Sequence, residues 1–347
     1  MAHVMQLPNI VIIGRNLKNR VAEVVLTASG GQPVLIITGK TAYSIYGRSV
    51  SEAIAEGADV EVHSIENEIS QELDIIHKIL SKRRFGAVVG IGGGRVIDVA
   101  KASAHEAGVR FVSVPTVASH DGIASPMVSA MDNNQPYSRM ASMPFAIVAD
   151  IDVIEKAPHR YVASGCGDLV AKYTAVRDWR LSHKVTGEYF GDYAASLAYM
   201  SAEIIFRNAK KIGERRQDSV RTVVEALISA GVAMGIAGSS RPCSGSEHLI
   251  CHALGRLMED PPLHGERCGV STIFAALAHK AAWKKVKAAL SSIGAPSNLS
   301  ELGVDEQTFV KAVIMAPDIR PDRYTILHKL RLAESDVRRM LREAELS

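Results

Sequence analysis

The first 150 residues alternate short apolar runs with amphipathic stretches, and this alternation restricts the fold more than any other feature of the chain. Six apolar runs predict strands, at residues 10–13, 34–38, 60–63, 87–89, 111–114 and 145–148. Helical spacing follows at residues 17–28, 43–55, 68–81 and 96–105. Because residues 34–37 are apolar without interruption, they suit a strand buried on both faces. We therefore predict an N-terminal α/β domain with a mainly parallel, Rossmann-like sheet.

Beyond about residue 155 the strand pattern ends and helical spacing takes over. The predicted helices cover residues 164–184, 191–209, 218–237, 245–258, 270–290, 305–314 and 333–343. An alanine and methionine stripe within residues 226–237 is typical of helix packing rather than of a cofactor site. The sequence thus predicts two domains, a nucleotide-binding α/β domain of residues 1–155 and an all-helical domain of residues 156–347.

A glycine-rich loop lies between the predicted strand at 87–89 and the helix that follows. Gly92, Gly93 and Gly94 precede a stretch in which helical spacing resumes at Val96. Free N–H groups and the positive end of a helix favour a phosphate there. Arg95 stands where the usual dinucleotide fingerprint has its last glycine, so the fingerprint itself is not met. A plain tight turn between strand and helix is the alternative reading.

Composition excludes several classes of function. The net charge is +3, and no basic run is interleaved with aromatic residues, so we expect no nucleic-acid partner. No signal peptide or long apolar span stands at the N-terminus, so we expect no membrane insertion. The four cysteines form no Cys-x-x-Cys pair, which favours a reduced, cytoplasmic protein.

Three places carry side chains that are typical metal ligands. Asp168 lies near the start of a predicted helix, His248 and His252 are four residues apart on one helix face, and His264 lies in a loop that enters a helix. Each alone suits a helix cap, a polar face or an ordinary loop residue. Together, one aspartate and two histidines form the nitrogen and oxygen set of a divalent metal that acts as a Lewis acid. No sulfur ligand is needed, so the cysteines are read as packing residues, with Cys166 and Cys251 near enough in sequence to line the pocket.

These motifs together resemble a known superfamily. The glycine loop with Asp98 and Lys101, the pair Pro115-Thr116, Asp168 and the two widely spaced histidines are similar to the dehydroquinate synthase-like superfamily, which includes iron-containing alcohol dehydrogenases and glycerol dehydrogenases. Segments 119–126, 165–172 and 320–325 resemble the archaeal sn-glycerol-1-phosphate dehydrogenases. The likeness spans nearly the whole chain.

The resemblance implies roles for particular residues. Asp168, His248 and His264 would hold one Zn²⁺ per subunit in the helical domain. Asp121, Asp168 and His252 would face the substrate, with Asp121 and His252 as the catalytic groups. The residues implied in cofactor binding are Gly92, Gly93, Gly94, Arg95, Val96, Ile97, Asp98, Thr116, Val117, Ala118, Ser119 and Ser125. Family loops often have serine where Arg95 stands, and the role of Arg95 stays open.

The implied reaction is the reversible reduction of dihydroxyacetone phosphate to sn-glycerol 1-phosphate by NADH or NADPH, which supplies the backbone of archaeal membrane phospholipids. The metal would polarise the C2 oxygen. The alternatives are a dehydroquinate synthase-type lyase, whose first metal ligand is usually glutamate rather than aspartate, a glycerol dehydrogenase, and an inactive metabolite-binding protein. The expected partners are a phosphorylated triose or glycerol and further copies of this chain.

Cofactor choice is predicted from the end of the second strand. An acidic residue at such a strand end binds the ribose hydroxyls of NAD and repels the extra phosphate of NADP. Here the strand at 34–38 is followed by Gly39, Lys40 and Thr41, and no carboxylate stands there. We therefore expect the enzyme to accept both NADH and NADPH.

Overall fold

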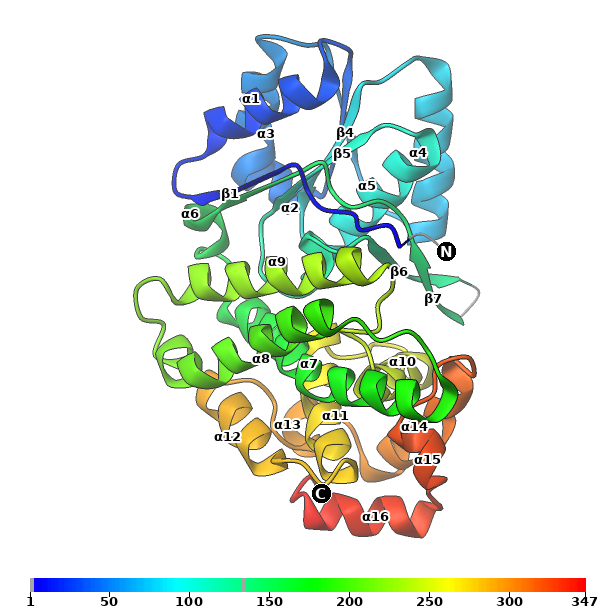
Figure 1. Ribbon diagram of the computed structural model, residues 1–347. Helices are drawn as coiled ribbons and strands as arrows, with labels where there is room; N and C mark the ends of the chain where they lie inside the picture. Colours follow the sequence, from blue (N-terminus) through cyan, green and yellow to red (C-terminus); the bar gives the residue numbers. More distant parts are fainter. Residues whose placement is uncertain (1–2, 133–134) are drawn as a thin grey trace. The chain divides into compact units, whose positions relative to one another are not determined.

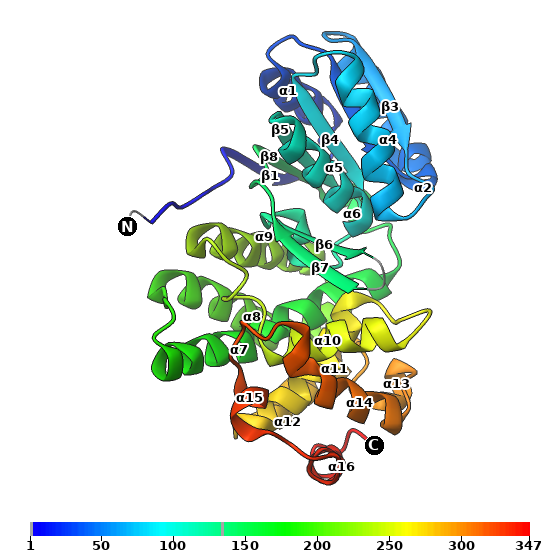
Figure 2. The same cartoon turned by 90° about the vertical axis from the view of Figure 1, so that its right-hand side faces the viewer.

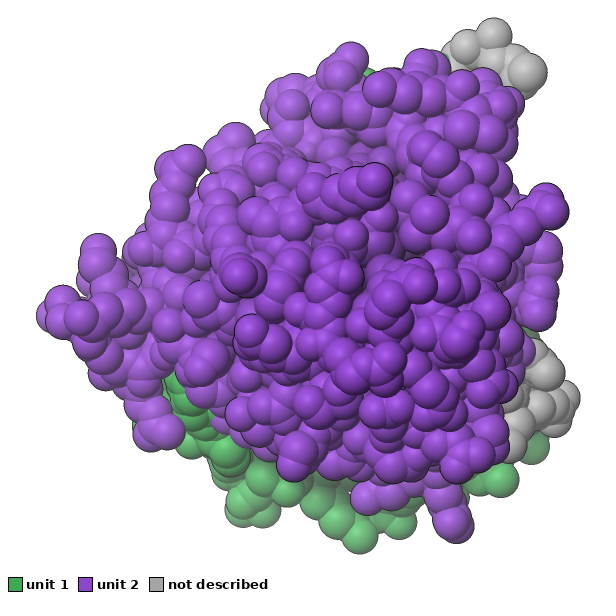
Figure 3. Space-filling model, turned by 90° about the horizontal axis from the view of Figure 1, so that it is seen from below, with its two compact units in different colours: residues 1–118, 122–159 green, residues 119–121, 160–347 purple. Residues whose placement is uncertain are grey.

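A computed structural model describes residues 3–132 and 135–347. The chain divides into two compact units, which Figure 3 colours separately. Unit 1 contains the residues up to Ala118 and Gly122–His159. Unit 2 contains Ser119–Asp121 and Arg160–Ser347.

Unit 1 is built on a six-stranded sheet in the order β1-β8-β5-β4-β2-β3, and every strand pair is parallel. This confirms the predicted parallel sheet. The strands are β1 (Ile10–Gly14), β2 (Val34–Thr38), β3 (Val60–Ser64), β4 (Ala87–Gly92), β5 (Arg110–Pro115) and β8 (Ala146–Asp150). The uninterrupted apolar run Val34–Ile37 in β2 is explained by burial on both faces, since all five residues of this strand are buried.

Helices cover both faces of this sheet. They are α1 (Lys18–Ser29), α2 (Lys40–Ala42), α3 (Arg48–Ala55), α4 (Ile69–Lys82), α5 (Gly94–Ala107) and the short α6 (Ile151–Ile154), with a π-helical turn at Tyr43–Gly47 between α2 and α3. Ile36 of β2 packs in one core cluster with residues of α1 and α3, whereas its neighbour Leu35 packs in another with residues of α4 and α5. Figure 2 views the sheet from the side that carries α4 and α5.

One antiparallel hairpin was not expected from the sequence. It consists of β6 (Met127–Asp132) and β7 (Gln135–Met140), which form a separate two-stranded sheet. Its segments contain serine, glutamine and arginine among the apolar residues and so lack the continuous apolar runs that marked the buried strands.

The neighbouring strands β2 and β4 form a topological switch point. The helix that follows β2 packs on one face of the sheet, and the helix that follows β4 packs on the other. Thr38 at the end of β2 pairs with Ile91 of β4, and its hydroxyl donates to the Ile91 carbonyl oxygen at 2.8 Å. The segments that leave these two strand ends therefore border the crevice in which open α/β sheets bind their ligands.

Unit 2 is helical, as predicted. Its helices are α7 (His159–Thr186), α8 (Asp192–Gly213), α9 (Ser219–Ala237), α10 (Ser246–Leu257), α11 (His264–Ala278), α12 (Trp283–Ile293), α13 (Leu299–Leu302), α14 (Glu306–Ile319), α15 (Ile326–Leu330) and α16 (Glu334–Glu343) (Figure 1). The single helix predicted over residues 270–290 is wrong. Lys280 has a φ of 52°, a left-handed conformation that an α-helix does not continue, and it separates α11 from α12.

Within the described residues, α9 alone is long and apolar enough to cross a membrane by length and composition. Its most apolar 18-residue stretch has a mean hydropathy of 1.6, and 67% of that stretch is buried inside the protein. Because a buried core helix passes the same test, α9 is weak support for a membrane span.

Candidate metal centre and cofactor loop

The predicted metal ligands lie close to the point where α7 and α11 cross with their backbones in contact. A Cβ atom added to Gly265 would lie 1.8 Å from the Ser164 carbonyl oxygen, and one added to Gly167 would lie 2.1 Å from the Gly265 carbonyl oxygen. Only glycine fits at either position. Asp168 follows Gly167 and His264 precedes Gly265, so the crossing that these glycines permit brings the two ligands together.

The start of α10 is held against α7 in a similar way. A Cβ atom on Gly245 would lie 2.6 Å from Oδ2 of Asp178, a fully buried residue of α7. The same carboxylate oxygen accepts a hydrogen bond from the Ser246 backbone N–H at 2.6 Å. This contact anchors the first turn of α10, which carries His248.

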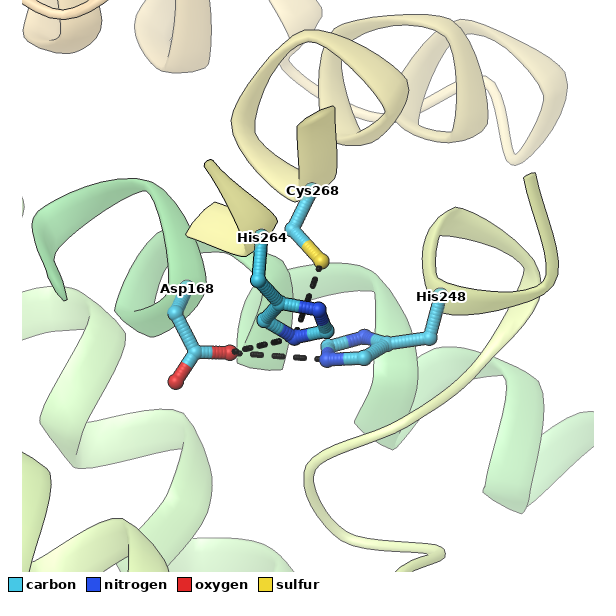
Figure 4. Close-up of side chains that lie close together, drawn as sticks. All are labelled: Asp168, His248, His264 and Cys268. Carbon is cyan, nitrogen blue, oxygen red and sulfur yellow. Dashed lines mark hydrogen bonds and ion pairs between the residues drawn. The ribbon is translucent and has the colours of Figure 1, made fainter. Parts of the chain in front are cut away.

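Two imidazole rings converge on one carboxylate oxygen. Nε2 of His248 lies 3.4 Å from Oδ1 of Asp168, and Nε2 of His264 lies 3.9 Å from the same atom (Figure 4). Cys268, one turn after His264 on α11, places its Sγ 3.5 Å from His264 Nε2. One ligand atom from each of these four residues lies within 4.8 Å of all the others. The structure thus brings together the three predicted ligands and adds a sulfur that the sequence analysis had set aside as packing.

Glu247 orients the His248 ring. Its Oε1 lies 2.9 Å from His248 Nδ1, while its Oε2 accepts from the Thr174 hydroxyl at 2.6 Å. Burial alone lowers the pKa of His248, but hydrogen bonds to Asp168 and Glu247 raise that pKa to about 9. A buried imidazole between two carboxylates requires a cation at Nε2, either a proton or a metal ion. The donor set therefore fits a divalent metal.

Cys251 of α10 lies near the other ring nitrogen of His264. Its Sγ lies 3.5 Å from Nδ1 of His264 and donates to the His264 carbonyl oxygen at 3.6 Å. A group that accepts a hydrogen bond from the Nδ1–H of His264 leaves Nε2 unprotonated, with its lone pair on the side of Asp168.

Lys172 is the main cation of the site and was not assigned a role from the sequence. Its fully buried ammonium lies 2.7 Å from Oδ1 of Asp168 and 2.7 Å from Oδ2 of Asp121. The Asp121 backbone N–H also donates to Oδ2 of Asp168 at 2.9 Å. Burial alone raises the pKa of Asp168, but the Lys172 charge holds it well below its ordinary value. Asp168 is therefore ionised, as a metal ligand must be.

His252 lies beside the cluster, one turn along α10 from His248. The centroid of its ring is 6.4 Å from that of His248 and 6.1 Å from that of His264. Burial lowers the pKa of His252 to about 3, so the ring is neutral at physiological pH. Asp121 and His252 thus flank the proposed ligands, and their substrate-facing roles stay predictions.

The glycine loop of unit 1 brings α5 against β4 and leads into the uncapped first turn of α5. A Cβ atom on Gly90 would lie 2.9 Å from Ala100 Cβ, and one on Gly92 would lie 2.7 Å from Val96 Cβ, so these two glycines let α5 pack close to β4. Gly93 is the residue before α5, and no side chain caps the helix there. The backbone N–H groups of this first turn are the ones that can bind an anion.

The other predicted cofactor residues lie in unit 1 except for Ser119. Val96 and Ile97 are buried in the core, so only their backbones remain for a ligand, whereas Arg95 is exposed. The Thr116 N–H donates to the Gly92 carbonyl oxygen at 3.0 Å and ties the segment after β5 to the glycine loop. The buried Lys101 of α5 donates to the carbonyl oxygens of Gly122 and Met127 and anchors the segment that contains Ser125.

Comparison with known proteins agrees with this architecture. The profile of the iron-containing alcohol dehydrogenase family matches residues 12–158. The glycerol-1-phosphate dehydrogenase [NAD(P)+] of Pyrococcus horikoshii is 46% identical over 330 residues, which cover 94% of each chain. That of Methanosarcina acetivorans is 44% identical and covers 93% of this chain and 91% of its own. The chain belongs to the glycerol-1-phosphate dehydrogenase family.

Two solved structures share the fold of this family member at low sequence identity. A probable glycerol dehydrogenase from Sinorhizobium meliloti has a TM-score of 0.79 at 20% identity and covers 99% of this chain and 98% of its own. The sulfoacetaldehyde reductase from Bifidobacterium kashiwanohense, solved in complex with NAD+, has a TM-score of 0.77 at 17% identity and covers 99% of each chain. At such identities the likeness shows the fold alone.

Proposed function

We propose that the protein catalyses the reversible reduction of dihydroxyacetone phosphate to sn-glycerol 1-phosphate by NADH or NADPH, the step that supplies the backbone of archaeal membrane phospholipids. The relatives named glycerol-1-phosphate dehydrogenase [NAD(P)+] match over 93–94% of this chain. The convergence of Asp168, His248 and His264 on one point carries the proposal, because it is the donor set that carbonyl reduction by metal polarisation needs.

One Zn²⁺ per subunit is the proposed occupant of this donor set. The ligands would be Oδ1 of Asp168 and Nε2 of each histidine, which already face one another. When bound, the metal supplies a Lewis acid that polarises the C2 oxygen of the substrate. Aspartate rather than glutamate at position 168 favours a dehydrogenase over the lyase branch of the superfamily.

The chain's own groups bind the substrate and move its proton. Lys172 holds the Asp121 carboxylate in place at 2.7 Å, so Asp121 is ready to accept a hydrogen bond from a substrate hydroxyl. We assign the proton relay to His252: its neutral imidazole accepts a hydrogen bond from the C2 hydroxyl when the alcohol is oxidised and passes a proton to the C2 oxygen when the ketone is reduced. In unit 1, the backbone N–H groups at the start of α5 bind the cofactor pyrophosphate.

The direct test mixes purified protein with dihydroxyacetone phosphate and NADH and follows the loss of NADH, with the stereochemistry of the product determined by chiral analysis. Formation of sn-glycerol 1-phosphate is expected. Oxidation of unphosphorylated glycerol at a higher kcat/KM would instead establish a glycerol dehydrogenase. Turnover of the dehydroquinate synthase substrate without net cofactor oxidation would establish a lyase.

Two variants separate the metal ligands from the substrate residues. His264→Ala should lose the metal, whereas His252→Ala should lower kcat/KM while the metal content stays near one per subunit. If the two outcomes are exchanged, His248 and His252 form the metal pair and the assignment is wrong. Elemental analysis of both purified variants provides the measurement.

We also propose a cytoplasmic homo-oligomer. The mostly buried state of α9 agrees with a location away from the membrane. Light scattering of the purified protein gives the number of subunits, and cell fractionation gives the location. A monomer in solution or recovery with the membrane fraction would contradict these two assignments.

A further inference from the structure

Cys268 lies near Nε2 of His264, the ring nitrogen that is the proposed metal ligand. It follows His264 by four residues on α11, so both side chains lie on the same face of the helix. Its Sγ is 3.5 Å from Nε2 of His264, the nitrogen that faces Asp168. In Figure 4 the thiol points at the same ring nitrogen as the Asp168 carboxylate.

The distances agree with tetrahedral coordination. With a zinc–sulfur bond of about 2.3 Å, a zinc–nitrogen bond of about 2.0 Å and tetrahedral angles, the sulfur and nitrogen ligands of one zinc ion lie about 3.5 Å apart. The same geometry separates oxygen and nitrogen ligands by about 3.3 Å. The observed separations are 3.5 Å for Cys268 and His264, 3.4 Å for Asp168 and His248, and 3.9 Å for Asp168 and His264. Two of the three pairs therefore already have the spacing that a shared ion imposes.

The second nearby cysteine provides a contrast. Cys251 also places its Sγ 3.5 Å from the His264 ring, but at Nδ1. The two thiols also contact each other, but the group of ligand atoms that all lie within 4.8 Å of one another includes Cys268 and not Cys251. Both thiols are fully buried, and burial alone does not distinguish them.

We propose that Cys268 is the fourth protein ligand of the metal in the substrate-free enzyme, so that the resting site is formed by Asp168, His248, His264 and the Cys268 thiolate. This inference rests on the proposed function in one respect, because it requires a divalent metal at Asp168, His248 and His264. A thiolate ligand makes the site softer than an all-nitrogen and oxygen set, so zinc and cobalt should bind in strong preference to magnesium and manganese.

X-ray absorption at the zinc edge of the substrate-free wild-type protein tests the proposal. A sulfur shell of one atom at about 2.3 Å is expected, because that is the length of a zinc–thiolate bond. The cobalt-substituted protein should show the near-ultraviolet charge-transfer absorption of a cobalt–thiolate bond. Neither readout depends on turnover.

Matched variants identify the sulfur. In Cys268→Ala the sulfur shell and the charge-transfer band should disappear and zinc should bind at least about 10-fold more weakly, because loss of a direct ligand costs no less than loss of a group that orients one. In Cys251→Ala, which removes a thiol at the same distance from the same ring, both signals should remain. Circular dichroism of each variant controls for folding, and the wild-type spectrum decides the matter if either variant fails to fold.

A stoichiometric metal bound without sulfur in the wild-type protein, or a sulfur signal that survives in Cys268→Ala, would overturn the inference. If such a protein still reduces dihydroxyacetone phosphate, the proposed function stands and only the role of Cys268 is refuted. If the wild-type protein binds no metal and shows no turnover, both are refuted.

Discussion

The two units build their proposed sites in opposite ways. In unit 1 the loop between β4 and α5 offers backbone N–H groups, and the N-cap residue Gly93 has no side chain that could bond to them. In unit 2 the site consists of side chains, with two imidazoles and a carboxylate held by Lys172 and Glu247. A backbone site depends on the path of the chain, whereas a side-chain site depends on the identity of each group.

Glycine permits close packing beside both proposed sites. Gly90 and Gly92 allow a helix to pack on a strand next to a loop that stays open to a ligand. Gly167 and Gly265 allow two helices to touch, and the ligands are the residues beside them. In both units glycine thus permits close packing, beside the proposed cofactor loop in unit 1 and beside the proposed metal ligands in unit 2. The two sites should therefore fail independently when they are perturbed.

Removal of the metal is the strongest test of that independence. Exhaustive chelation should lower kcat/KM by at least about a thousandfold, which corresponds to about 4 kcal/mol of lost transition-state stabilisation. Most of the helical structure should persist, because α7, α10 and α11 are buried in a large core rather than joined by the ion alone. NADH should still bind within about threefold of its original affinity, since its proposed contacts are backbone groups of unit 1.

The measurements are steady-state kinetics, circular dichroism and the fluorescence of bound NADH, with the absence of metal checked by elemental analysis. Re-addition of zinc should restore the activity. Full activity without metal would remove the basis of the proposed chemistry. Loss of NADH binding together with the metal would show that the two sites are not independent.

The second test disturbs the helix crossing in unit 2. Gly265→Ala should weaken zinc binding by about 10- to 100-fold, because the added methyl group overlaps the Ser164 carbonyl oxygen and pushes His264 away from Asp168. Overpacking of this kind costs about 1–3 kcal/mol of stability, so the melting temperature should also fall. Calorimetry and metal titration measure both effects. Gly39→Ala is the control, since its Cβ would lie 3.9 Å from the nearest atom; equal zinc affinity in the two variants would contradict the argument.

The difference between the two sites also explains what the sequence revealed. The parallel sheet was predictable because strands such as β1 and β2 are continuous apolar runs, and the glycine loop because glycine marks a backbone function. Asp168, His248 and His264 were identified as candidates because such side chains stand out in apolar segments. Their proximity was not predictable, because it depends on helix crossings that link Gly167 with residues almost a hundred positions away.

The supporting groups of the metal site were missed for a different reason. Lys172 and Cys268 each stand four residues after a proposed ligand, at Asp168 and His264, which is the spacing that had drawn attention to His248 and His252. That signal was present, but a lysine or a cysteine on a helix is usually a surface or packing residue. Glu247 directly precedes His248, and adjacency along a helix does not suggest a shared contact.

The third test separates the two functions of glycine in unit 1. Gly93→Ala should raise the KM for the nicotinamide cofactor about tenfold while the melting temperature and metal content change little, since the new methyl group meets only a Val117 methyl at 3.3 Å. Gly92→Ala should mainly lower the melting temperature, because its methyl group would lie 2.7 Å from Val96 Cβ. Kinetics and thermal unfolding of both variants provide the data. If Gly93→Ala binds NADH and NADPH as tightly as the wild type, the loop is a plain turn.

The smallest expected effect concerns the choice between NADH and NADPH. No carboxylate follows β2 in sequence, but the structure brings one from the segment after β3, since the exposed Lys40 ammonium lies 2.9 Å from Oε1 of Glu66. The two charges largely cancel at the strand end where cofactors are distinguished, so kcat/KM for NADH and NADPH should agree within about tenfold.

Glu66→Gln frees Lys40 and should shift the ratio of kcat/KM values towards NADPH, and Lys40→Ala should shift it towards NADH. Each shift should stay below about fivefold, because an exposed ion pair is weak and is screened by salt. Steady-state kinetics of the three proteins with both cofactors measure the ratio. A wild-type preference beyond about a hundredfold corresponds to about 2.7 kcal/mol, more than this pair can supply, and would place the discrimination elsewhere in unit 1.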